Sequence, residues 1–276
     1  MTTTLRSTTL PPATRPAGID GALRSEWTKL RTVRSTVWSL VAMAGVSLGL
    51  MSLIAWATMR GWDSFTPDQQ ASFLHSPLQI VLARPVFVDQ LVVAVLGVMV
   101  ISAEYTTGMV RSTLQAQPRR LTVLGAKVAV FAALMFVVGE VLSFAAFFLG
   151  RQLISAHIPV SLGDPHVVRA VIGGGLYLTV LGLFSLAAGA IVRHTAGAIT
   201  GVLGLILIVS NLTSLLPDSW GQHINAWMPT NAGRLILQTQ QAPEDLLSPW
   251  QGLAVFAGWT ALLLLVAAVL FKRRDA

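Results

Sequence analysis

The stretch VWSLVAMAGVSLGLMSLIAWAT, residues Val37–Thr58, is 22 residues long and contains no charged side chain. A helix of roughly 20 mainly apolar residues is long enough to cross the hydrocarbon layer of a bilayer. Further apolar runs follow at Val86–Ala103, Leu121–Leu149, Val168–Val192, Ala196–Leu216 and Gly252–Phe271. Because lipid offers the backbone no hydrogen-bond partners, each run is predicted to be a helix. The sequence therefore predicts an all-α, polytopic membrane protein with six transmembrane helices.

The composition of the 276-residue chain agrees with a membrane protein. Apolar residues make up 54% of it and charged residues only 11%, too few to cover a water-facing surface. The chain has no cysteine, which excludes a disulfide framework, a thiol nucleophile and a thiolate metal site. The histidines show no pair at the spacing of a helical metal site. We therefore expect no metal and no bound cofactor.

The basic residues indicate how the chain is oriented. Of the 19 Lys and Arg residues, fourteen lie before the first apolar run, around the loop after the second, after the fourth or at the C-terminus, with Lys127 counted in that loop although it lies just inside the third run. These segments share one side of a six-helix topology, and the positive-inside rule makes that side cytoplasmic. Both termini are therefore expected in the cytoplasm. The net charge of +7 follows from this topology and from attraction to anionic lipid, so nucleic acid is not an expected partner.

Two different segments precede the first apolar run. Residues 1–20 are rich in Thr and Pro and predict a disordered cytoplasmic tail, which leaves 21–276 as the transmembrane domain. Within residues 22–36, Leu23, Trp27 and Leu30 fall on one arc of a helical wheel and basic residues flank them. This pattern predicts an amphipathic helix on the inner membrane surface. The alternative is an ordinary charged flank of the first span.

The segment EYTTGMVRSTLQAQPRR, Glu104–Arg120, is the most specific stretch of the chain. On a continuous helix Glu104 and Arg111 share one face, Gly108 permits a close approach, and Pro118 ends the helix. The pattern predicts a short helix across the cytoplasmic mouth of the bundle, charged enough to be hydrated and apolar enough to dock. We interpret it as a contact for another protein.

Together with SEWTKLRTVRSTVW, Ser25–Trp38, this segment resembles the permease subunits of type-2 ATP-binding-cassette exporters, in particular actinobacterial-type members. The resemblance implies that 22–36 is an elbow helix and 104–120 a coupling segment that contacts a separate cytoplasmic ATPase chain. It also implies a bacterial cell membrane, a second permease copy as a homodimer, and export of a drug-like, lipid or other amphipathic substrate. In the coupling segment, the residues expected to contact the ATPase are Glu104, Tyr105, Gly108, Arg111, Leu114, Pro118 and Arg119.

The chain contains no glycine-rich phosphate cradle of the form G-x-x-x-x-G-K-[ST]. We therefore expect no ATPase activity of its own, with ATP bound by the partner. A gradient-driven transporter or channel acting alone is the alternative, and a membrane-embedded enzyme or scaffold is disfavoured by the lack of a catalytic constellation.

Glu140 lies inside the third apolar run, and a membrane-buried acid is by default a functional candidate. It is a possible transport-path residue; the alternative is a protonated or paired acid between helices. Gly45 with Gly49, and Gly197 with Gly201, form G-x-x-x-G pairs that favour packing within the chain or a dimer face. The patch 232–237, in the last external segment, is a possible re-entrant element.

Overall fold

The computed structural model describes residues 18–117, 119–213, 218–242 and 245–273, and these ranges contain helices and no strand. Six helices are long and apolar enough to cross a membrane, which confirms the predicted all-α architecture. They are α2 (Arg34–Arg60), η2 (Gln79–Ala83) with α4 (Arg84–Thr106), α6 (Arg120–Ile154), α7 (Val167–Val192), α8 (Thr195–Gly204) with η3 (Leu205–Val209) and α9 (Ser210–Leu212), and α12 (Pro249–Arg273).

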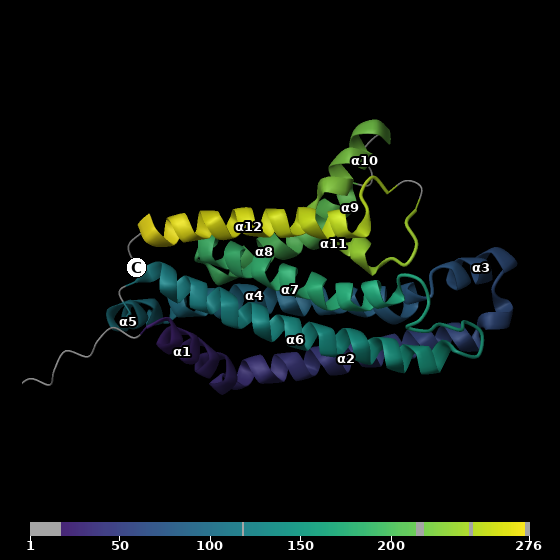
Figure 1. Cartoon of the computed structure of the whole chain (residues 1–276), viewed down its shortest axis with the longest axis horizontal. Coiled ribbons are helices and arrows are strands. Elements are labelled where there is room, and N and C mark those ends of the chain that lie inside the picture. The colour runs from purple at the N-terminus through teal and green to yellow at the C-terminus, as the bar shows by residue number, and fades with distance from the viewer. Residues whose placement is uncertain (1–17, 118, 214–217, 243–244, 274–276) are drawn as a thin grey trace, which may run out of the picture.

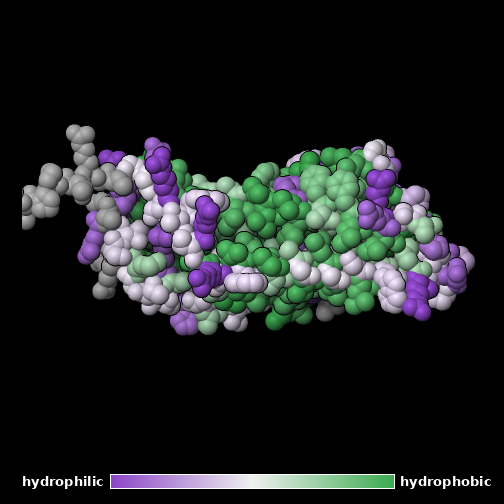
Figure 2. Space-filling model, turned by 90° about the horizontal axis from the view of Figure 1, so that it is seen from below, coloured by the Kyte–Doolittle hydropathy of each residue, from purple (hydrophilic) through white to green (hydrophobic). Residues whose placement is uncertain are grey.

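The long helices run side by side along the length of the molecule (Figure 1). The helices α1 (Ile19–Thr32) and α5 (Met109–Ala116) lie at one end, which we call the junction end. The helix α3 (Pro67–His75) marks the opposite, far end. On the face seen in Figure 2, apolar side chains gather between these ends and polar side chains gather at both ends. This distribution suits a multi-pass membrane protein.

The helix α7 is the centre of the bundle and packs against α4, α6 and α12. Glycines bring the helices close together: a Cβ atom on Gly97 would lie 2.8 Å from the Cβ of Ser185 in α7. A Cβ on Gly139 would lie 3.0 Å from the Cα of Gly175. Such positions have no room for a side chain, so they set the spacing between the helices.

The G-x-x-x-G pairs predicted from the sequence lie elsewhere. A Cβ on Gly45, Gly49 or Gly201 would meet nothing within 4 Å, and one on Gly197 would meet only His194, the N-cap of its own helix, and Val192 at the end of α7. These glycines do not form packing seams within the chain. The close approaches come instead from other glycines around α7, among them the consecutive Gly173, Gly174 and Gly175.

The second span begins earlier than predicted. The sequence predicted the second apolar run from Val86, but Leu78, Ile80, Val81 and Leu82 are buried and continue the helix of α4 outward. Pro85 has no backbone N–H, and a π-turn over Gln79–Ala83 precedes it, which lets the chain stay helical across the proline. The loop is further shortened by η1 (Trp62–Ser64) and by α3, which starts with a Thr66–Gln69 capping box.

The segment before α12 is folded into the protein. It contains α10 (Asp218–Trp227), α11 (Pro229–Arg234) and η5 (Leu235–Leu237). Ile236 is fully buried against Gly173 of α7, and Gly233 lies against Phe256 of α12 and Tyr177 of α7. The predicted re-entrant patch 232–237 is therefore surrounded by helices, which is the setting that such an element requires.

The N-terminal boundary also differs from the prediction. Residues 1–17 of the predicted tail lie outside the described residues, and Ile19 and Asp20 belong to α1. The helix ends at Thr32, ahead of the predicted end at residue 36, because Val33 is extended. This break separates α1 from α2 and allows the two helices to run in different directions.

Candidate functional site

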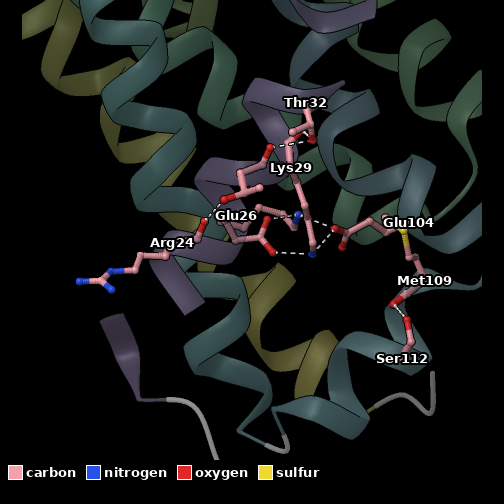
Figure 3. Close-up of polar contacts among 9 residues, drawn as sticks. Arg24, Glu26, Lys29, Thr32, Glu104, Met109 and Ser112 are labelled. Atoms are coloured by element: carbon pink, nitrogen blue, oxygen red, sulfur yellow. Dashed lines mark hydrogen bonds and ion pairs between the residues drawn. The ribbon is translucent and has the colours of Figure 1, made fainter. Parts of the chain in front are cut away.

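Four charged side chains from three helices meet inside the junction end (Figure 3). We call Glu26, Lys29, Glu104 and Lys127 the ion cluster. Lys29 Nζ lies 2.7 Å from Glu26 Oε1 and 2.9 Å from Glu104 Oε1. Lys127 Nζ lies 2.5 Å from Glu26 Oε2 and 2.9 Å from Glu104 Oε1. Each lysine therefore bridges both carboxylates, and the cluster is neutral as a whole.

The ion cluster joins elements that are distant in the sequence. Glu26 and Lys29 are one turn apart on α1, Glu104 lies near the end of α4, and Lys127 is in the third turn of α6. Glu26, Glu104 and Lys127 are only 3%, 6% and 4% exposed. Charges buried this deeply are tolerated only when they are paired and hydrogen-bonded. The cluster therefore fixes α1 against the ends of two spanning helices.

Lys29, at the edge of the cluster, remains charged. Partial burial opposes its charged form, but hydrogen bonds to Glu26 and Glu104 and the negative charges of these groups outweigh burial, so the pKa of Lys29 is raised above its ordinary value of 10.5. The raised pKa means that its contribution to stability is complete below pH 10.5 and is lost only as the pH rises through the raised value. Changes of pH within the physiological range therefore leave the charge of Lys29 unchanged.

The short helix α5 covers the ion cluster. It begins after Gly108, whose φ of +70° is the left-handed conformation that glycine adopts most readily. Val110 is buried and Leu114 half-buried, and both line a small pocket that also contains Glu104 and Lys127. The outer side of α5 is exposed at Met109, Ser112 and Gln115. Thus one side of α5 rests on the cluster and the other faces outward.

A second contact holds the end of α4. The guanidinium of Arg193, in the turn between α7 and α8, lies 4.9 Å from the ring centroid of Tyr105. Arg193 has a φ of +57°, a strained conformation for a residue with a side chain. Nearby, Thr195 Oγ1 is 3.0 Å from Ser102 Oγ of α4. The end of α4 is therefore held from both sides, by the ion cluster and by the α7–α8 turn.

The predicted contact residues do not share one surface. The prediction that Glu104 and Arg111 lie on one continuous helix is wrong, because the chain turns at Thr107 and Gly108 between α4 and α5. Glu104 is buried in the ion cluster, which removes its carboxylate from the surface. Tyr105 stacks with Arg193, whereas Arg111 lies within α5 and Arg119 is exposed just before α6.

The end of the predicted segment has its own geometry. Pro118 lies outside the described residues, and α5 ends at Ala116 with an extended Gln117, the backbone that a residue before proline prefers. Of the predicted contact residues that the structure describes, only Gly108, Arg111, Leu114 and Arg119 thus belong to α5 or its immediate flanks.

Glu140, the other predicted site residue, lies in α6 beside Gly175 of α7. Both of its carboxylate oxygens are buried without a hydrogen-bond partner among the described residues. Asp89 of α4 resembles it: Asp89 Oδ2 accepts a hydrogen bond from Ser47 at 2.9 Å, while Oδ1 has no described partner. Two acids are therefore buried among the spanning helices, where the sequence analysis placed only Glu140.

Several residues of the site were not predicted from the sequence. Lys127 offered a signal, because a lysine inside an apolar run needs a partner. Glu26 and Lys29 offered a second signal in their spacing of three residues on an amphipathic helix. Nothing in the sequence pointed to Arg193. Among the described residues no group of three His, Cys, Asp or Glu side chains is arranged to hold a metal ion.

Comparisons with known proteins found no match, either to a protein-family model or to a curated protein. The arrangement of the junction end and of the buried acids is thus the basis for assigning a function.

Proposed function

We propose that the chain is the permease subunit of an ATP-binding-cassette exporter, driven by a separate cytoplasmic ATPase chain. Two copies of the chain, with two ATPase chains, would form the translocation unit in a bacterial cell membrane, with both termini in the cytoplasm. The cargo would be a drug-like, lipid or other amphipathic molecule. The observation that carries the proposal is α5, a short helix with an exposed outer side that rests on the ion cluster between two spans.

In this proposal α5 is the coupling helix and α1 the elbow helix. A partner that binds the outer side of α5 differently in its ATP-bound and nucleotide-free states would bias the position of α5. Leu114 and Val110 transmit that shift to the pocket that contains Glu104 and Lys127. Because the ion cluster ties α1, α4 and α6 together, these helices would move as a group.

The predicted contact residues then have different roles. Arg111 and Arg119 are the basic residues of the segment that would contact the ATPase, and Gly108 provides the turn that sets the angle of α5. Glu104 acts inside the protein as a positioning residue. Tyr105 holds the end of α4 through Arg193. In this proposal the energy comes from the partner, because the sequence has no phosphate cradle of its own.

The proposal is tested by co-purification of the tagged chain, in detergent, with the proteins expressed beside it. The native chain is compared with Arg111→Glu and Gly108→Trp on α5 and with Lys272→Glu, an exposed control at the junction end of α12. We expect an ATP-hydrolysing chain to co-purify with the native and Lys272→Glu proteins and to be lost from both α5 variants. Purification of the native chain without any ATP-hydrolysing partner would contradict the proposal.

A second candidate function is a gradient-driven transporter, which the buried acids Asp89 and Glu140 favour. Such a protein would work without an ATPase. In vesicles that contain only this chain, it would dissipate an imposed pH gradient, and Glu140→Gln or Asp89→Asn would abolish that flux. An intact gradient in vesicles with the native chain would exclude this function.

A further inference from the structure

A cavity of about 890 Å³ lies near the far end of the molecule, away from the ion cluster. Its wall comes from the second half of α2, the start of α4, and the segment that contains α9, α10, α11 and η5. A volume of several hundred cubic ångströms is typical of small-molecule sites. The cavity is therefore large enough for a ligand with a headgroup and part of a chain.

Two arginines lie on the same part of this wall. Arg84 and Phe87 are three residues apart on α4 and therefore neighbours on its surface. The guanidinium of Arg234, from α11, lies 5.9 Å from the ring centroid of Phe87. Both arginines are exposed to the cavity lumen or solvent, and Arg84 forms no hydrogen bond or ion pair with any residue of the described ranges. Both cations thus line the cavity, and one of them lies against an aromatic ring of the same wall.

The cavity wall carries less negative charge than positive charge. Asp245 is the one acid among the described residues that line the cavity, and its Oδ2 accepts a hydrogen bond from the backbone of Ala242 at 2.9 Å. Amide side chains add to the arginines: Asn225 and Asn231 line the cavity, and Asn225 Oδ1 accepts hydrogen bonds from Thr213 and Asn231. The wall therefore favours an anion with oxygen acceptors.

The rest of the wall is apolar. Leu50 and Ile54 lie one turn apart on α2, a spanning helix, and Phe87 and Val88 lie on α4. These positions belong to helices that are long and apolar enough to cross a membrane. The cavity thus combines a cationic part with an apolar part contributed by spanning helices. This combination suits an amphiphile better than a wholly polar solute.

We propose that this cavity binds an amphiphile with a single acidic headgroup, either phosphate or carboxylate. The headgroup would lie between Arg84 and Arg234, since guanidinium groups bind such oxygens through paired, charge-assisted hydrogen bonds. The acyl chain would pack against Leu50, Ile54 and Phe87. The identification of this ligand as the exported cargo rests on the proposed function. Its binding to the cavity does not depend on that function.

The test uses the full chain, purified without any ATPase in a non-ionic detergent. Binding of oleate and of phosphatidylglycerol is measured by native mass spectrometry and compared with phosphatidylcholine and a neutral monoacylglycerol. We expect both acidic amphiphiles to bind at least tenfold more tightly than the neutral ones. The double variant Arg84→Gln/Arg234→Gln should lose that preference, while Arg151→Gln, an exposed arginine of α6 outside the cavity, should keep it.

The arms of the experiment separate the two sources of the ligand. Preference for phosphatidylglycerol alone would identify a bilayer lipid, and preference for oleate alone a free fatty acid; both support the acidic-headgroup site. Equal binding of neutral and acidic amphiphiles, or unchanged preference in the double variant, would overturn the proposal. Should the double variant fail to fold, Arg84→Gln alone serves, because its side chain has no bonded partner among the described residues.

The binding experiment and the ATPase co-purification test the two proposals separately. Acid-selective binding by a chain that never co-purifies with an ATP-hydrolysing partner would support the proposed binding site and contradict the proposed exporter function. The reverse result, an ATPase partner without acid-selective binding, would support the proposed exporter function and contradict the proposal that its cargo is an acidic amphiphile.

Discussion

The four side chains of the ion cluster show how a membrane protein tolerates charge in its interior. Two lysines and two glutamates neutralise one another, and every ion has two partners of opposite charge. Removing one ion would leave an unbalanced charge among buried side chains. Breaking such a network by removal of one member costs far more than replacing an oppositely charged pair together.

Lys127→Met should therefore destabilise the protein strongly. It leaves Glu26 and Glu104 with only Lys29 between them, and we expect a loss of about 3 to 5 kcal/mol in unfolding free energy. The measurement is thermal or denaturant unfolding of the purified chain in detergent. The double variant Glu26→Gln/Lys127→Met removes one charge of each sign and should recover a large part of the loss. Equal destabilisation of the single and double variants would refute the role of charge balance.

Gly108 sets the angle of α5 through its positive φ, and a Cβ atom there would meet nothing within 4 Å. Gly108→Ala should therefore cost only the strain of the left-handed backbone, about 1 to 2 kcal/mol. We expect a modest fall in melting temperature and a clear loss of ATPase co-purification. Gly125→Ala is the control, since this site in α6 is also open but has no positive φ. A Gly108→Ala protein that retains the ATPase fully would show that the angle of α5 is unimportant.

At the scale of elements, the sequence predicted helices well where apolar runs end at polar residues. The bounds of α7 and α12 lie close to the predicted runs, because Arg193 and the Lys272–Arg273 pair mark their ends. The start of the second span was missed because Pro85 and Arg84 suggested a loop. The π-turn that carries the helix past Pro85 depends on burial of Ile80, Val81 and Leu82, which a local pattern does not reveal.

The junction was predictable only in part. Glycine and proline at 108 and 118 indicated a short helix between two spans, and α5 lies there. The burial of Glu104 depends on Lys29, 75 positions earlier, and on Lys127, 23 positions later. Pairings across such distances are set by how α1, α4 and α6 pack, and a single sequence carries little information on that.

The packing of α7 yields a prediction about glycine. Gly97→Val would place methyl groups against Ser185 and the backbone of α7, and overpacking of this kind costs about 1 to 3 kcal/mol or more. Gly49→Val, on the open face of α2, has space and should change stability by less than about 0.5 kcal/mol. The melting temperatures of the two purified variants provide the comparison. A Gly97→Val protein as stable as Gly49→Val would contradict the described contact between α4 and α7.

At the scale of the whole molecule, α4 connects the two candidate sites. It carries Arg84 and Phe87 at the cavity and Glu104 at the ion cluster. At 1.5 Å of rise per residue, the 23 residues of this helix span about 35 Å, close to the thickness of a membrane core. A displacement of α4 at the junction end would therefore be carried to the wall of the cavity.

The orientation of the molecule is testable because the chain has no cysteine of its own. Single substitutions Ser112→Cys in α5 and Ser64→Cys near α3 place one thiol at each end, and both residues are exposed. We expect a membrane-impermeant maleimide to label Ser64→Cys in intact cells and Ser112→Cys only after permeabilisation. The opposite pattern would place the junction end outside the cell, beyond the reach of a cytoplasmic ATPase.

The central claim, that α5 is the contact site for a separate ATPase, is tested most directly by photo-crosslinking in living cells. A photoreactive amino acid replaces Gln115, exposed on α5, and in a parallel strain replaces Asp68, exposed on α3. We expect the Gln115 site to crosslink to a nucleotide-binding chain with a phosphate cradle and the Asp68 site not to do so. A Gln115 site that crosslinks to lipid alone, or to the same products as Asp68, would contradict it.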